Sequence, residues 1–131
     1  MIDVESYIFN AVYDDVAPLC ASGCFKSIHD PVPTKFPTAT LYEMKNLTDY
    51  AKKSTAQDED FATLTYEAHV YANTKAKCRT VFAALDAALI RMNMSRISGD
   101  YTPSADNTKV HEFVARYRVS VDRDGILYRK P

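Results

Sequence analysis

Two cysteines and a histidine are the first residues whose types and spacing suggest chemistry. Cys20 and Cys24 lie four positions apart, and His29 follows them. This spacing is compatible with part of a structural zinc site, in which thiolates and imidazoles are common ligands. Such a site needs four ligands, and the sequence offers no fourth one nearby. We therefore predict no metal and interpret the cysteines as small thiols, buried or half-buried.

The two other histidines fall in segments that are expected to be strands. His111 lies on the apolar side of its strand, where a hydrogen-bonded core histidine is expected. His69 lies on a polar side and is expected to be solvated. Neither belongs to a recognisable nucleophile motif, although a triad can assemble in space from distant positions. A site built from His69, Asp100 and Cys20 therefore stays open as a hypothesis. We predict no enzyme, no catalytic residue and no cofactor.

A long polar segment, Asn46 to Asp60, carries a run of three consecutive acidic residues. The run lacks the spaced ligands and the glycine of a calcium-binding EF-hand loop, so a solvated loop is the plain interpretation. The segment is long for a connection between two strands, and such loops in compact domains are often functional. We expect it to be mobile in a free monomer and to supply subunit contacts through Tyr50, Lys52, Lys53, Asp58, Glu59 and Asp60.

Two arginines indicate another candidate interaction surface, on a strand. The segment Val110 to Val121 alternates, which places Arg116 and Arg118 on one face and the aromatic residues on the other. Basic residues interleaved with aromatic ones can bind single-stranded nucleic acid, but here the aromatics point away. We expect Arg116 and Arg118 to form a subunit interface, with Arg96, Arg123, Arg129 and Lys130 near them. A small nucleic-acid-binding or regulatory module is the alternative.

The elements that position these residues centre on one strand and one helix. Phe61 to Tyr71 alternates between apolar and polar residues, which is typical of a strand with one buried face. Asn73 is a candidate N-cap for the helix that follows, at about 74–93. The helix carries an apolar stripe at intervals of three and four, made of Cys78, Val81, Leu85, Ala88, Leu89 and Met92. Strand and helix are most simply buried against each other.

The rest of the chain adds a helix and further strands around this pair. Asp3 can cap a helix at about 3–17, with Ile2 and Tyr7 as a hydrophobic staple. Strands are expected at Thr38 to Lys45, Ser95 to Tyr101, Val110 to Val121 and Ile126 to Arg129. We predict a single α+β domain over residues 1–131, with a mainly antiparallel sheet of about four to five strands and two helices on one face.

Composition limits the function classes. The chain has 131 residues, a net charge of −1 and 47% hydrophobic residues, which suit one ordinary core and exclude binding by overall basicity. No apolar stretch approaches the length of a membrane span. The N-terminal segment carries acidic residues at the place where a signal peptide would carry positive charge. We expect a protein made in the cytosol, with its three cysteines reduced.

In layout the chain resembles the tail terminator, or tail completion, proteins of long-tailed bacteriophages. The resemblance covers nearly the whole chain: the N-terminal helix, the extended entry FPTATLYEMK, the charged loop, the strand–helix pair and the ending MSRISGDYTPSADNTKVHEFVARYRVSVDRDGILYRK. It implies a non-enzymatic virion protein that forms a ring, a hexamer, on the last ring of tail tube protein and joins it to the head connector. DNA would be only cargo passing through the channel, and other neck proteins of similar fold stay open.

Overall fold

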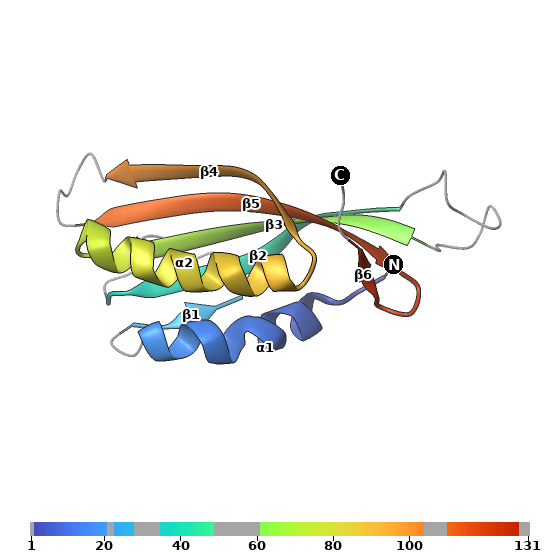
Figure 1. The fold of residues 1–131 in the computed structure, drawn as a ribbon, viewed down its shortest axis with the longest axis horizontal. Helices are drawn as coiled ribbons and strands as arrows, with labels where there is room; N and C mark the ends of the chain where they lie inside the picture. The colour runs from blue at the N-terminus through green and yellow to red at the C-terminus, as the bar shows by residue number, and fades with distance from the viewer. Residues whose placement is uncertain (1, 21–22, 28–34, 49–60, 104–109, 129–131) are drawn as a thin grey trace.

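The structure, a computed structural model, describes residues 2–20, 23–27, 35–48, 61–103 and 110–128. Two α-helices and a six-stranded sheet make up this part of the chain (Figure 1). Their bounds are α1 Glu5–Val16, the 3-10 helix η1 Ala17–Cys20, β1 Phe25–Lys26, β2 Thr38–Thr48, β3 Phe61–Ala72, α2 Lys75–Arg91, β4 Ser95–Pro103, β5 His111–Asp122 and β6 Leu127–Tyr128. The predicted α+β class is confirmed.

The sheet is almost entirely antiparallel. Its strand order is β1-β2-β3-β5-β4, with β6 paired to β5, and only the short β1–β2 pair is parallel. β3 and β5 are central and pair along their whole length, from Phe61 opposite Asp122 to Ala72 opposite His111. The ends of β2 and β3 that flank residues 49–60 extend beyond α2 (Figure 1).

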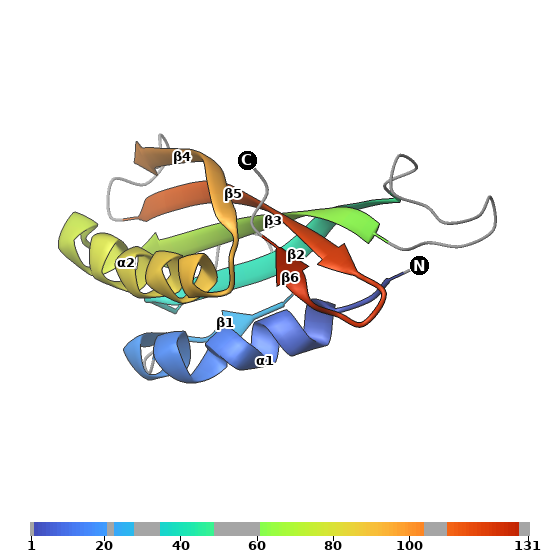
Figure 2. The same ribbon diagram turned by 45° about the vertical axis from the view of Figure 1, so that its right-hand side comes forward.

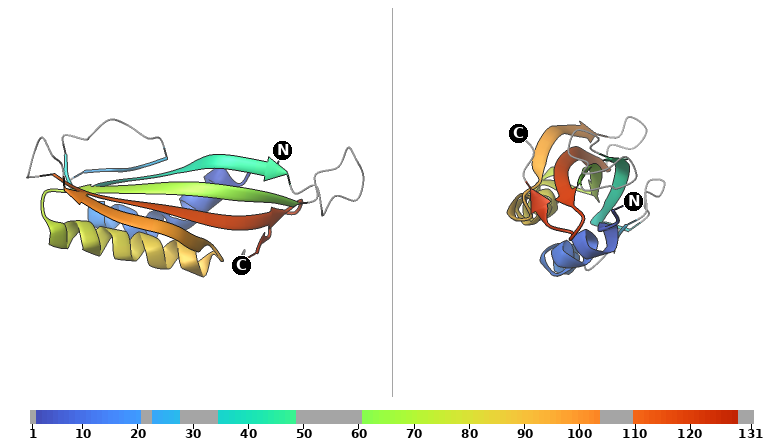
Figure 3. Two further views of the ribbon diagram at one scale, coloured as in Figure 1. Left: turned by 90° about the horizontal axis from the view of Figure 1, so that it is seen from above. Right: turned by 90° about the vertical axis from the view of Figure 1, so that its right-hand side faces the viewer.

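Both helices lie side by side on one face of the sheet, which curls around them (Figures 2 and 3). This face carries the alternating apolar residues of the strands, because successive side chains of a strand point to opposite faces. The predicted core is confirmed except at Met92: the other residues of the α2 stripe and the apolar side of β3 belong to one buried cluster, and Met92 is partly buried against it. Its members include Ile8, Val12, Val16, Leu41, Leu64, Tyr66, Val70, Val81, Leu85, Leu89, Tyr117 and Val119.

Element ends differ from the predicted ones by a few residues. β2 continues to Thr48, so the charged connection begins three residues later than Asn46 suggested. Its last residues pair with the start of β3, and this pairing outweighs their polar composition. α2 is capped by Thr74 rather than Asn73: the Thr74 hydroxyl accepts a hydrogen bond of 3.2 Å from the Lys77 backbone N–H. The Asp3 side chain accepts a bond from the Glu5 N–H, but Val4 occupies the N-cap position of α1.

Among the described residues, no helix is long and apolar enough to cross a membrane.

Candidate functional site

The face of the sheet opposite the helices carries most of the polar side chains of the central strands. We call it the polar face. Six side chains from β2, β3 and β5 form a connected cluster on it, and we call this cluster the His69 network: Tyr42, Glu67, His69, Tyr71, Glu112 and Arg116. Cross-strand register brings them together, because Glu67 lies opposite both Tyr42 and Arg116, and Tyr71 lies opposite Glu112.

Glu67 contacts three other members of the network. It is only 7% exposed. One carboxylate oxygen accepts from the Tyr42 hydroxyl and lies 2.6 Å from His69 Nε2, and the other accepts from Arg116 Nε at 2.9 Å. Burial alone would raise the pKa of Glu67, but the hydrogen bonds from Tyr42, His69 and Arg116 outweigh it and lower that pKa to about 2. Glu67 is therefore a charged anchor within the sheet.

His69 is also buried, at 7% exposure, so the prediction that it is solvated is wrong. Its ring lies nearly parallel to the rings of Tyr42 and Tyr71, with interplanar angles of 9° and 7°. Its Nδ1 lies 2.9 Å from Glu112 Oε2, and its Nε2 faces Glu67. The alternation of β3 correctly placed His69 on the polar face, but the flanking rings and carboxylates come from register with β2 and β5, which a single strand does not reveal.

The two arginines of the predicted interface do lie on the polar face. Arg116 is an exposed residue whose Nε is bound to Glu67, while Arg118 is half-buried and lies opposite Thr65 and Ser95. Arg96 does not join them: it lies opposite Tyr117, on the helix side, where its guanidinium is 3.4 Å from Asp86. Glu67 and Glu112 balance much of the positive charge near Arg116, which weakens the nucleic-acid alternative.

The two edges of the sheet are a second candidate surface, distinct from the polar face. β4 forms one edge, and Arg96, Ile97, Ser98, Gly99 and Asp100 are all exposed. At the other edge, β1 pairs only with Ala39 and Thr40, so most of β2 has no described partner on that side. Each edge strand has a register shift that sets one apolar side chain out of the regular pairing, Ile97 in β4 and Met44 in β2.

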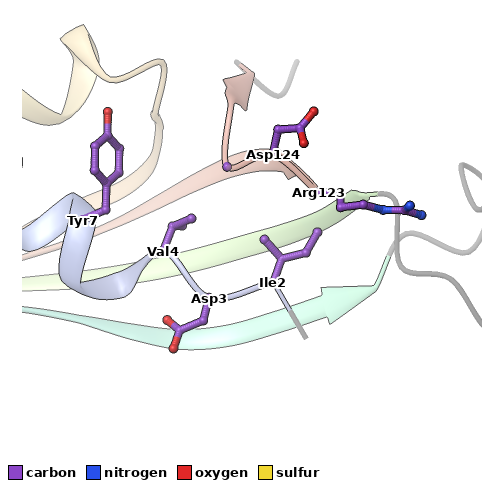
Figure 4. A pocket seen from close by; sticks show the side chains of 7 residues that line it. Ile2, Asp3, Val4, Tyr7, Arg123 and Asp124 are labelled. Carbon is purple, nitrogen blue, oxygen red and sulfur yellow. The ribbon is translucent and has the colours of Figure 1, made fainter.

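A pocket lies apart from both features, between the start of α1 and the turn from β5 to β6 (Figure 4). Ile2, Val4 and Tyr7 give it an apolar side, and Gly125 lies against Val4. The charged side chains around it, Asp3, Arg123 and Asp124, point in different directions rather than converging (Figure 4). This arrangement does not resemble a small-molecule site, which has a few convergent polar groups.

The cysteines do not form a reactive or metal-binding group with the other described residues. Cys20 belongs to the core on the helix side, whereas His69 lies on the polar face, so the sheet separates two members of the hypothetical triad. Burial, followed by the nearby Cys24, raises the pKa of the Cys20 thiol to about 11. No group of three metal-ligating side chains is present in the described ranges. His29 lies outside them, as do Tyr50, Lys52, Lys53, Asp58, Glu59, Asp60, Arg129 and Lys130.

Comparison with protein-family models gave no match, and neither did comparison with curated proteins. Among solved structures, the chain is similar to a chain in the virion of a native gene transfer agent (GTA) particle. The TM-score is 0.59 and the identity 16%, over 83% of this chain and 90% of that chain. At this identity the similarity shows a shared fold.

Proposed function

We propose that this chain is a structural protein of a phage-like virion, which forms a ring on the end of the tail tube. The shared fold with a chain of the GTA virion, over most of both chains, is the observation that carries this proposal. The ring ends the growth of the tube and joins it to the head connector. Its partners are further copies of the chain, in a hexamer, the tail tube protein and the connector protein, and DNA only passes through.

The directions of the edge strands suit a ring. Three antiparallel steps lead from β2 through β3 and β5 to β4, so β2 and β4 run in opposite directions. In a ring with rotational symmetry all subunits have the same orientation along the axis. The β4 edge of one copy then meets the β2 edge of the next as an antiparallel pair, which continues the pattern of the sheet. Ring closure also covers edges that would otherwise invite uncontrolled pairing.

Side chains on the two edges are compatible with this contact. Asp100 on β4 and Lys45 on β2 are exposed and lie on the polar face, so they can meet as opposite charges. Ile97 on β4 is 45% exposed and Leu47 on β2 is 60% exposed, which gives each edge an apolar residue to bury. These residues, rather than a catalytic group, are the functional residues that we assign.

Edge variants test the ring contact. Ile97→Asp should block the β4 edge and Leu47→Asp the β2 edge, so each variant alone should be monomeric by native mass spectrometry while the natural chain forms a closed oligomer. Because each variant keeps one intact edge, an equimolar mixture should form one-to-one dimers and no ring. Ile126→Asp, at a position that is 52% exposed in the connection between β5 and β6 and outside both β2 and β4, is the matched control and should assemble normally.

Two outcomes would contradict the head-to-tail contact. A natural chain that stays monomeric at all concentrations would contradict the proposal that the chain assembles into a ring by itself. Leu47→Asp protein that forms dimers by itself would contradict the head-to-tail contact, because that contact needs an intact β2 edge.

A further inference from the structure

The two sheet edges that meet in the proposed ring match in length as well as in direction. β1 pairs with β2 near its start, so a neighbouring copy meets the part of β2 that follows, residues 41–48. The opposite edge, β4 Ser95–Pro103, is of similar length. An antiparallel register with Asp100 opposite Lys45 lays residues 97–103 of one copy along residues 41–48 of the next.

The next pair in this register is Tyr101 with Glu43, because the register shift of β2 takes Met44 out of the pairing. Directly opposite residues of an antiparallel pair share a face of the sheet. Tyr101 and Glu43 satisfy this rule on the helix side. Tyr101 is opposite Phe113, which packs against a phenylalanine of α2, and Glu43 is opposite the core residue Tyr66. The register therefore fits both faces of the two strands.

Lys75 brings a positive charge to the β4 edge on the helix side. It is the first residue of α2, and this helix begins at the end of the molecule where β4 ends (Figure 1). The Lys75 side chain is exposed, and its Nζ lies 4.7 Å from the centroid of the Tyr101 ring, as in a cation–π contact. The ammonium group thus lies beside the position that Glu43 of the next copy occupies in this register.

Glu43 is the matching acidic residue on the β2 edge. It is half-buried, and its Oε1 accepts a hydrogen bond of 3.3 Å from the Tyr66 hydroxyl. Burial, and after it the negative charge of Glu5, raises the pKa of Glu43, and a nearby cation would offset both effects. Lys75 of the same copy is too distant, because it follows the end of β3 and the stretch from Tyr66 to Ala72 spans roughly 20 Å.

We propose that Lys75 of each copy pairs with Glu43 of the next copy, on the helix side of the edge contact. This inference rests on the proposed ring and adds the residues that set its register. Asp100 and Lys45 form the second charged pair of the same register, on the polar face. A slip of the strands by two residues, roughly 7 Å, separates both pairs, so the charges select one register as well as the partner edge.

Cross-linking of the assembled natural chain tests the pair directly. A carbodiimide joins an amine to a carboxylate without a spacer, so it links side chains that touch. In rings assembled from isotope-labelled and unlabelled copies, we expect a cross-linked peptide that joins Lys75 of one copy to Glu43 of another. Mass spectrometry should find it with one labelled and one unlabelled half. An oligomer without this cross-link, or with the cross-link only inside single copies, would overturn the pair and leave the ring.

Charge reversal gives an independent test. Lys75→Glu should raise the protein concentration needed for half-assembly about tenfold, because it sets two carboxylates against each other. The variant should fold, since an acidic residue suits the first turn of a helix. Lys77→Glu is the matched control: it makes the same charge change about 200° around the helix and should assemble normally.

Glu43→Gln shows whether the effect of Lys75→Glu depends on Glu43. The glutamine keeps an oxygen for the Tyr66 hydroxyl but carries no charge, so in this background Lys75→Glu should change the half-assembly concentration by less than about threefold. An undiminished effect would overturn the pair, and so would equal effects of Lys75→Glu and Lys77→Glu. A natural chain that stays monomeric would contradict the ring itself, and the pair with it.

Discussion

Gly23→Ala should destabilise the fold by about 3 kcal/mol, because there is no room for a side chain at this position. A Cβ added to Gly23 would lie 2.0 Å from the backbone oxygen of Pro37. The close approach belongs to the segment that sets β1 beside the start of β2, where the Cys24 N–H donates to the Thr38 hydroxyl at 3.3 Å. Backbone atoms cannot move aside as the end of a flexible side chain can, so the whole contact must open.

Gly99→Ala is the matched control for this substitution. Its added Cβ would lie 3.2 Å from the Phe113 ring, which can adjust by a few tenths of an ångström. We expect a change below about 1 kcal/mol in the free energy of unfolding, measured by urea denaturation of the monomer. Equal effects of the two substitutions would mean that β1 does not need its close contact with β2.

Leu85→Ala should cost about 2–5 kcal/mol of folding free energy. Leu85 is fully buried in the layer between α2 and the sheet, so its removal leaves a cavity among neighbours that cannot all close in. Arg79→Ala, on the exposed side of the same helix, should change the free energy of unfolding by less than about 0.5 kcal/mol. A loss below about 0.5 kcal/mol for Leu85→Ala in chemical denaturation would contradict the position of α2.

The core could be predicted from the sequence because its signals are local. Leu64, Tyr66 and Val70 alternate along one strand, and Val81, Leu85 and Leu89 recur along one helix. The apolar strand face and the apolar helix stripe each need another apolar surface to pack against, and the two segments are adjacent in the chain. The fold class followed from these periodicities, and so did the face on which Arg116 and Arg118 lie.

The candidate site could be predicted only in part, because it depends on register between strands. The alternation of β3 shows that Glu67 and His69 share a face, but their burial comes from Tyr42, Tyr71 and Glu112. Nothing in the local sequence fixes these pairings. β1 was missed for a related reason: two residues are too few for any periodicity, and the strand exists only through its pairing with Ala39 and Thr40.

The bulge in β4 explains the error on Arg96. A strand pattern in which side chains alternate strictly between the two faces does not reveal a bulge. In β4 the register shifts between Arg96 and Ser98, and Ile97 is left out of the pairing. Arg96 therefore lies over the helix side, with Asp86 and the Phe82 ring, and takes no part in the polar face. The same bulge turns Ile97 outward at the edge, where the proposed ring contact uses it.

The role in tail assembly is tested most directly by electron microscopy of particles from which this gene has been deleted. If the chain caps the tail tube, tails should vary in length, extend beyond the normal length and lack attached heads. The natural gene and Ile126→Asp should restore tails of one length joined to heads, whereas Ile97→Asp should not. Heads joined to tails of normal length in the absence of the gene would contradict the proposed function.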